Sequence, residues 1–170
     1  TIYLDSAATT PLHPDVLAAM MPYLADGYGN PSSIYRLGQD TKAAIDAARR
    51  QVAGGLGCQP GEVIFTSGAT ESDNLALMGT LWHARFRHAS GAMPHLVVSA
   101  IEHHAVLHSA EFLQRQGFGL TIVPVDREGF VSPAQVEAAL RPETALVSIM
   151  LANNEVGTVQ PIREMSGLVK

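Results

Sequence analysis

Short, almost continuous apolar runs are the clearest pattern along the chain. They are His95–Ser99, Gly119–Val123 and Ala145–Met150. A strand that is buried on both faces of a parallel sheet has this pattern, because neither of its faces meets water. A shorter run, Val63–Phe65, predicts a further strand.

Segments with apolar residues at helical spacing separate these runs. Strands that alternate with helices predict an α/β fold, with an open, largely parallel sheet flanked by helices. One expected helix starts near Pro14, a second covers about Ile34–Val52, and a third continues through Leu75, Met78, Leu81 and Trp82. The segment Glu102–Val106 leads into a fourth, which reaches about Gln116; a fifth runs from Pro133 to Leu140, and a sixth begins near Pro161.

Composition supports a folded domain and narrows the function classes. Of 170 residues, 46% are hydrophobic and 16% are charged, which is typical of a globular rather than a disordered chain. The formal net charge is −5 and no basic run occurs, so we expect no nucleic-acid partner. No apolar stretch is long enough to span a bilayer, so we expect no membrane role. With one cysteine, Cys58, and no signal-peptide pattern at the start, a cytoplasmic location is expected.

Ligands bind open α/β sheets beyond the carboxyl ends of the strands. The polar loops expected at those ends are Thr66–Thr70, Ala100–His104 and Leu151–Gly157. The first loop joins an apolar run to a helix start, where backbone N–H groups and the helix dipole attract an anion such as a phosphate. The alternative is a capping box between Thr70 and Asp73, which needs no ligand. The loop contains neither a Walker motif nor the dinucleotide-binding fingerprint.

The other two loops contain histidine and asparagine side chains. His103 or His104 could stack on a flat ring or move a proton near neutral pH. His104 and His108 could share a helix face, but no acidic partner completes a metal-binding pattern, so no metal is expected. Asn153 and Asn154 could make a turn or bind a ligand. Cys58 lies in an expected turn, and nothing near it predicts a lowered thiol pKa.

Together these stretches resemble the pyridoxal-phosphate enzymes of the class V aminotransferase group, and most closely the cysteine desulfurases of the NifS/IscS type. The resemblance implies a fold-type-I transferase domain, pyridoxal 5'-phosphate as cofactor and L-cysteine as substrate. The matching stretches, in family order, are Tyr3–Pro11, Gly29–Ser33, Phe65–Asn74, Glu102–Val106 and Val147–Gly157.

The resemblance also implies roles for single residues. Ala69 and Thr70 match the positions that hold the cofactor phosphate. His103 matches the catalytic histidine that stacks on the pyridine ring and moves protons. Asn154 matches the asparagine near the cofactor's phenolic oxygen, and Asn30 matches a substrate-side position.

Other family features have no counterpart in the chain. No Ser-x-His-Lys motif occurs, and the only lysines, Lys42 and Lys170, do not match the lysine that binds the cofactor. Cys58 does not match the persulfide position. We therefore expect an N-terminal portion, inactive alone, with residues 1–14 joining the small domain of relatives and residues 15–170 forming an incomplete large domain.

The resemblance further implies sulfur transfer from L-cysteine to a protein persulfide, for iron–sulfur cluster assembly or other sulfur transfer. It implies a homodimer in the full-length form and a sulfur-acceptor or scaffold protein as partner. A selenocysteine lyase, another class V enzyme, and a non-catalytic half of a split or degenerate protein remain as alternatives.

Overall fold

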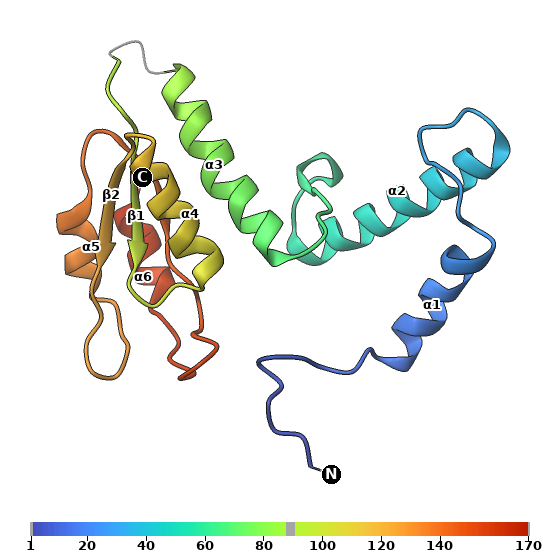
Figure 1. Cartoon of the computed structure of the whole chain (residues 1–170), viewed down its shortest axis with the longest axis horizontal. Coiled ribbons are helices and arrows are strands. Elements are labelled where there is room, and N and C mark those ends of the chain that lie inside the picture. Colours follow the sequence, from blue (N-terminus) through green and yellow to red (C-terminus); the bar gives the residue numbers. More distant parts are fainter. Residues whose placement is uncertain (1, 88–90, 170) are drawn as a thin grey trace. The chain divides into compact units, whose positions relative to one another are not determined.

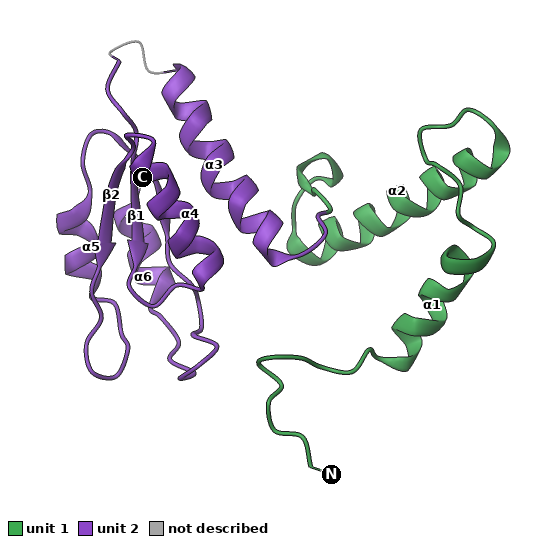
Figure 2. Ribbon diagram, viewed as in Figure 1, with its two compact units in different colours: residues 1–65 green, residues 66–170 purple. Residues whose placement is uncertain are grey.

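The computed structural model describes residues 2–87 and 91–169, which form two compact units, residues 1–65 and 66–170 (Figures 1 and 2). The first unit contains helices α1 (Pro14–Ala25) and α2 (Arg36–Leu56) and a short 3₁₀ turn, η1 (Pro60–Glu62). The second unit contains the sheet. Its elements are α3 (Ala69–Arg87), β1 (His95–Ser99), α4 (His104–Arg115), β2 (Gly119–Val123), α5 (Pro133–Ala139), β3 (Thr144–Ser148) and α6 (Ile162–Leu168).

The described strands form a parallel three-stranded sheet in the order β2-β1-β3. Because β1 is central, all five of its residues are buried. Leu96 and Val98 pack with Leu81 of α3 and Leu113 of α4, whereas Val97 packs on the opposite face with residues of α5 and α6. Successive side chains of a strand point to opposite faces, so this division follows from the run of apolar residues. The result is a sheet between two helical layers, as predicted.

The prediction of a strand at Val63–Phe65 was wrong. The carbonyl of Val63 accepts a hydrogen bond from the Arg49 guanidinium, and the same guanidinium lies 4.9 Å from the centre of the Phe65 ring. No described strand pairs with this segment. A run of three apolar residues therefore extends along α2 of its own unit without joining a sheet.

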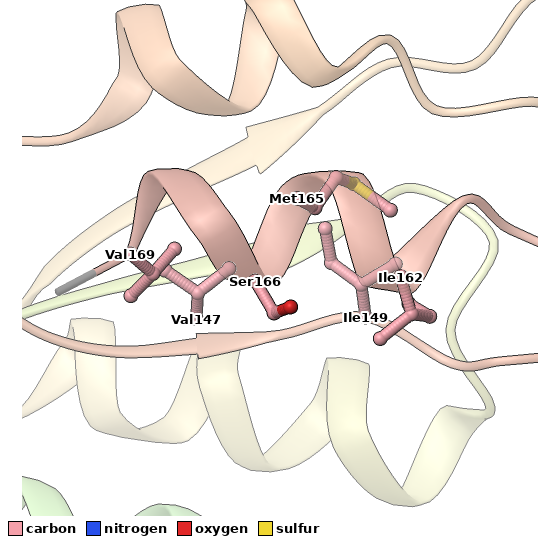
Figure 3. A pocket seen from close by; sticks show the side chains of 6 residues that line it. All are labelled: Val147, Ile149, Ile162, Met165, Ser166 and Val169. Atoms are coloured by element: carbon pink, nitrogen blue, oxygen red, sulfur yellow. The ribbon is translucent and has the colours of Figure 1, made fainter.

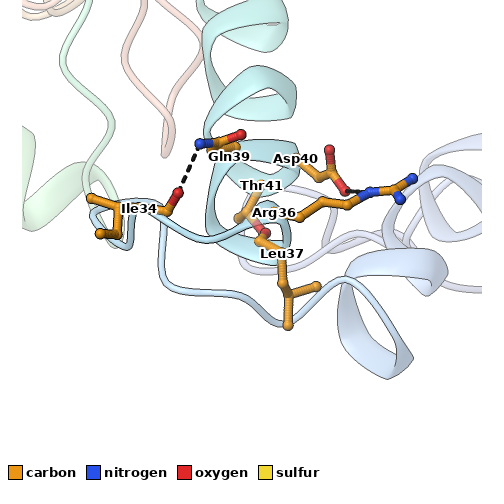
Figure 4. A network of polar contacts seen from close by, with 6 residues as sticks. All are labelled: Ile34, Arg36, Leu37, Gln39, Asp40 and Thr41. Carbon is orange, nitrogen blue, oxygen red and sulfur yellow. Dashed lines mark hydrogen bonds and ion pairs between the residues drawn. The ribbon is translucent and has the colours of Figure 1, made fainter.

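In the first unit, the loop before α2 packs tightly on the start of that helix. Its bonds include Gln39 Nε2 to the Ile34 carbonyl (2.7 Å), and Arg36 pairs with Asp40 at 3.7 Å (Figure 4). A Cβ atom on Gly38 would lie 2.5 Å from the Ser33 carbonyl oxygen and closer than 3 Å to that of Asn30. Gly38 is thus required by the close approach of the loop that contains Asn30.

Among the described residues, no helix is both long and apolar enough to cross a membrane. The helices of the second unit instead bury their apolar faces on the sheet, as their contacts with β1 and β2 show.

At the amino end of the sheet, His95 is only 1% exposed. Its ring nitrogens lie 2.8 Å from the hydroxyl of Thr144 on β3 and 2.9 Å from that of Thr121 on β2. Burial lowers the pKa of His95, and the positive charge of Arg141 lowers it further. The ring therefore links all three strands in its neutral form.

We expect Gly38→Ala to destabilise the protein by about 1–3 kcal/mol, because the new methyl group overlaps two backbone carbonyls. The matched control is Gly54→Ala in the same helix, where a Cβ atom would meet nothing within 4 Å. That change should stabilise the protein by about 0.5–1 kcal/mol through helix propensity. Denaturant unfolding of both variants measures the difference. Equal effects of the two substitutions would contradict the close contact.

We also expect the free energy of unfolding to fall as the pH drops below 6.5, the ordinary pKa of histidine. The folded state holds the His95 pKa below that value, so in this window the unfolded chain binds more protons. Unfolding measured between pH 7.5 and 5 should show a smaller decrease for His95→Gln than for the wild type. His83→Gln, on an exposed position of α3, is the control and should keep the wild-type decrease.

Candidate functional site

The loop before α3 is held by its own side chains. The Glu71 carboxylate accepts hydrogen bonds from the backbone N–H and the hydroxyl of Ser67, each at 2.7 Å, and the Thr66 and Ser72 hydroxyls lie 2.7 Å apart. The two bonds from Ser67 lower the pKa of Glu71. The capping interaction is thus made by Ser67 and Glu71, not by the Thr70–Asp73 pair that the sequence suggested as an alternative.

The start of α3 keeps the features of an anion site. An α-helix supplies no carbonyl acceptors for its first N–H groups, here those of Ala69, Thr70 and Glu71. The positive end of the helix dipole lies at the same place. A Cβ atom built on Gly68 would meet nothing within 4 Å, so space is open above this turn. Backbone donors, a hydroxyl and open space together fit a phosphate group.

His103 is exposed and forms the N-cap of α4. Its Nδ1 accepts a hydrogen bond from the Ala105 backbone N–H at 3.1 Å. An imidazole nitrogen that accepts a hydrogen bond carries no proton, so the proton of the neutral ring lies on Nε2. The cap therefore leaves Nε2 as the atom that can exchange a proton.

Helices α3 and α4 bring Thr70 and His103 to one open groove of about 420 Å³. Asn74 connects the two helices, because its Nδ2 donates to the Thr70 carbonyl (2.7 Å) and its Oδ1 accepts from the Ser109 hydroxyl (3.0 Å). Sequence reasoning gave no role to Asn74, whose contacts depend on a residue 35 positions away. The groove is lined by Thr70, Asn74, Met78, His103, His104, Ala105, His108, Ser109 and Phe112.

The other histidines of the groove are stacked on each other. The His104 and His108 rings are 5.0 Å apart and inclined by only 24°. In the part of the chain that the structure describes, no group of three or more histidine, cysteine or acidic side chains could hold a metal ion. The groove thus offers aromatic faces and hydroxyl groups.

The loop after β3 places its two asparagines differently. Asn153 is buried, and its Oδ1 accepts the backbone N–H groups of Glu155 and Val156, both at 2.9 Å. Its Nδ2 donates to the Ile101 carbonyl at 3.0 Å, which joins this loop to the loop of His103. Asn154 is exposed, donates to the Glu155 carboxylate, and does not line the groove of Thr70 and His103. Asn153 therefore makes the turn that presents Asn154.

Two predicted residues lie in the first unit. Asn30 is exposed and its Oδ1 accepts the Ser32 backbone N–H at 2.9 Å, which is an Asx turn. Cys58 is half-buried in the turn after α2, where its N–H donates to the Ala53 carbonyl. The structure thus gives both residues turn geometry, and a substrate role for Asn30 stays a prediction.

A second hollow, of about 290 Å³, lies between β3 and α6 (Figure 3). Ser166 is the one polar side chain among its lining residues, and its hydroxyl donates to the Arg163 carbonyl. The remaining lining residues are Val147, Ile149, Ile162, Met165 and Val169. This hollow lacks the donors that a phosphate requires, so it does not compete with the start of α3 as an anion site.

The model of the family described as aminotransferase class-V matches residues 2–170. The chain belongs to the class V aminotransferase family. The chain is 47% identical over 169 residues to the cysteine desulfurase IscS of Methanosarcina thermophila. It is 50% identical over 169 residues to the putative cysteine desulfurase IscS 1 of Bacillus subtilis (strain 168). The alignments cover 99% of this chain but 41% and 43% of these relatives, so the chain spans about two fifths of their length.

Solved structures agree with the sequence relatives. A NifS-like protein superimposes with a TM-score of 0.89 at 38% identity. The superposition covers 99% of the present chain and 45% of the NifS-like chain. A structure of SspA in complex with cysteine gives 0.90 at 40% identity, covering 99% and 47%. The resemblance inferred from the five motifs is therefore confirmed at the level of the family and the fold.

Proposed function

We propose that this chain forms part of a pyridoxal-phosphate-dependent cysteine desulfurase. It supplies the binding site for the cofactor phosphate and the histidine that stacks on the cofactor ring. The observation that carries the proposal is the single groove that contains both Thr70 and His103. The relatives named cysteine desulfurase, and the similar structure that contains cysteine, support L-cysteine as the substrate. In this reaction L-cysteine and a protein thiol yield L-alanine and a protein persulfide.

The proposed site uses the start of α3 for the cofactor phosphate. The N–H groups of Ala69 and Thr70 and the Thr70 hydroxyl donate to the phosphate oxygens, and the helix dipole stabilises their charge. The Glu71 carboxylate accepts two hydrogen bonds from Ser67, and these bonds hold the turn before α3 in place. When bound, pyridoxal phosphate supplies the electron sink for bond breaking at the amino-acid α-carbon.

His103 provides a flat ring and a defined proton site. Since Nδ1 accepts the Ala105 N–H, Nε2 is the atom that donates or takes up a proton at the groove. Asn154 is proposed to bind the phenolic oxygen of the cofactor, and Asn30 to contact the substrate. Both side chains are exposed, which is compatible with these roles.

We further propose that the lysine, the persulfide cysteine and the remaining cofactor contacts lie outside these 170 residues. The two lysines and Cys58 do not match the family positions. The same proposal assigns residues 1–14 to the small domain and residues 15–170 to the large domain. It also includes a homodimer, a cytoplasmic location, and delivery of sulfur to an acceptor or scaffold protein for iron–sulfur clusters.

Replacing Thr70 by valine should weaken cofactor binding in the protein that carries this chain. The change removes a hydroxyl that donates to a charged phosphate, at a cost of about 1.5–3 kcal/mol, or roughly ten- to a hundredfold in dissociation constant. Thr70→Ser keeps the hydroxyl and is the matched control. Titration of the cofactor's visible absorbance measures both variants. Wild-type affinity in Thr70→Val would contradict the role of the hydroxyl.

The 170-residue polypeptide by itself should release no alanine from L-cysteine when pyridoxal phosphate is added, because no lysine of the chain matches the family's cofactor-binding position. Alanine and sulfide are quantified after incubation, with a full-length cysteine desulfurase relative assayed in parallel. Production of alanine by the isolated polypeptide would refute this part of the proposal.

A further inference from the structure

The turn that presents His103 is connected to each strand end around it. The Ala100 N–H donates to the carbonyl of Val123 at the end of β2 (2.9 Å), and Asn153 donates to the Ile101 carbonyl (3.0 Å). Glu102, the residue before His103, makes a further connection, to the ends of β1 and β3. Glu102 Oε1 accepts hydrogen bonds from the Ser99 hydroxyl at 2.5 Å and from the Met150 backbone N–H at 2.8 Å.

Glu102 thus joins the carboxyl ends of two neighbouring strands through one oxygen atom. Ser99 is the last residue of β1, and Met150 lies two residues after β3. His103 follows Glu102 directly and begins α4 as its N-cap. The turn that contains His103 is therefore tied to the sheet through Glu102, and the His103 ring is tied to α4 through the Ala105 N–H.

The position of Glu102 is unfavourable for a carboxylate. The residue is 7% exposed, and none of the ion pairs found among the described residues includes it. Burial raises its pKa, the bonds from Ser99 and Met150 act in the opposite direction, and the nearby negative charge of Asp73 raises it further. Burying an acidic side chain costs stability, and the two hydrogen bonds to Oε1 offset part of that cost.

We propose that Glu102 is a positioning residue that holds the His103 imidazole in its working orientation. This inference rests on the role of His103 in the proposed function. Glu102 acts through its acceptor oxygen, which ties the turn to β1 and to the segment after β3. Its charge is not needed, because both of its partners are neutral donors.

The test compares Glu102→Ala with Glu102→Gln in the protein that carries this chain. Glutamine keeps the size of the side chain and an acceptor oxygen for Ser99 and Met150, whereas alanine removes both bonds. Gln160→Ala is the matched control, because Gln160 is also buried and also makes two hydrogen bonds, with the Val131 N–H and the Gly129 carbonyl.

The first readout needs neither cofactor nor turnover. The ¹⁵N chemical shifts of His103 in the cofactor-free protein, assigned with a His103→Gln variant, report which ring nitrogen carries the proton. The wild type and Glu102→Gln should show the Nε2-protonated form, and Glu102→Ala a mixture of both forms. A wild-type spectrum in Glu102→Ala would overturn the proposal. If that variant fails to fold, Ser99→Ala, which removes one of the two bonds, should show a smaller shift toward the mixture, and no shift would overturn the proposal.

The second readout is steady-state desulfuration of L-cysteine. Glu102→Ala should lower kcat at least about tenfold and leave KM within about twofold, since a misplaced proton-transfer group affects the chemical step more than binding. Glu102→Gln should remain within about threefold of the wild type. A loss of kcat in Gln160→Ala equal to that in Glu102→Ala would overturn the proposal, because general destabilisation would then explain both. An inactive wild type would instead refute the proposed function, and the ¹⁵N spectra would still decide the role of Glu102.

Discussion

Burial of β1 on both faces is the constraint on which the second unit depends. Leu96 and Val98 contact the layer of α3 and α4, and Val97 contacts the layer of α5 and α6. One strand of five residues therefore contributes to both hydrophobic clusters. Because the strands are parallel, the loops that follow β1 and β3 leave the sheet at the same edge, and every polar contact between these loops depends on that arrangement.

Polar side chains then convert this arrangement into a defined site. Asn74 connects α3 to α4, Asn153 connects the loop after β3 to the loop after β1, and Glu102 connects the ends of the two strands. Each of these side chains is buried or half-buried and has its bonds satisfied within the unit. Thr70 and His103 are exposed residues of the groove. Asn74 lines the groove with them, whereas Glu102 and Asn153 do not line it.

The two ends of the sheet have different chemistry. At the amino end, the His95 ring joins three strands through the hydroxyls of Thr144 and Thr121. At the carboxyl end, a buried carboxyl group and helix starts gather donors and acceptors near open space. At this edge the first N–H groups of α3 have no carbonyl acceptors within their helix.

The sequence by itself determined the alternation of strands and helices, the location of β1 and β2, and the family. The apolar runs indicate the strands, and the five motifs and their order indicate the family. Both can be recognised in the sequence without coordinates. The sequence also predicted Thr70 and His103 as site residues, from the small polar loop before α3, the histidines after β1 and the resemblance to the family. The run Val63–Phe65 misled this reasoning, since a strand exists only where a neighbouring strand supplies hydrogen bonds, and here Arg49 takes the Val63 carbonyl. Only the tertiary structure decided the roles of Asn74, Glu102 and Asn153, because their partners lie 35, 48 and 52 positions away along the chain.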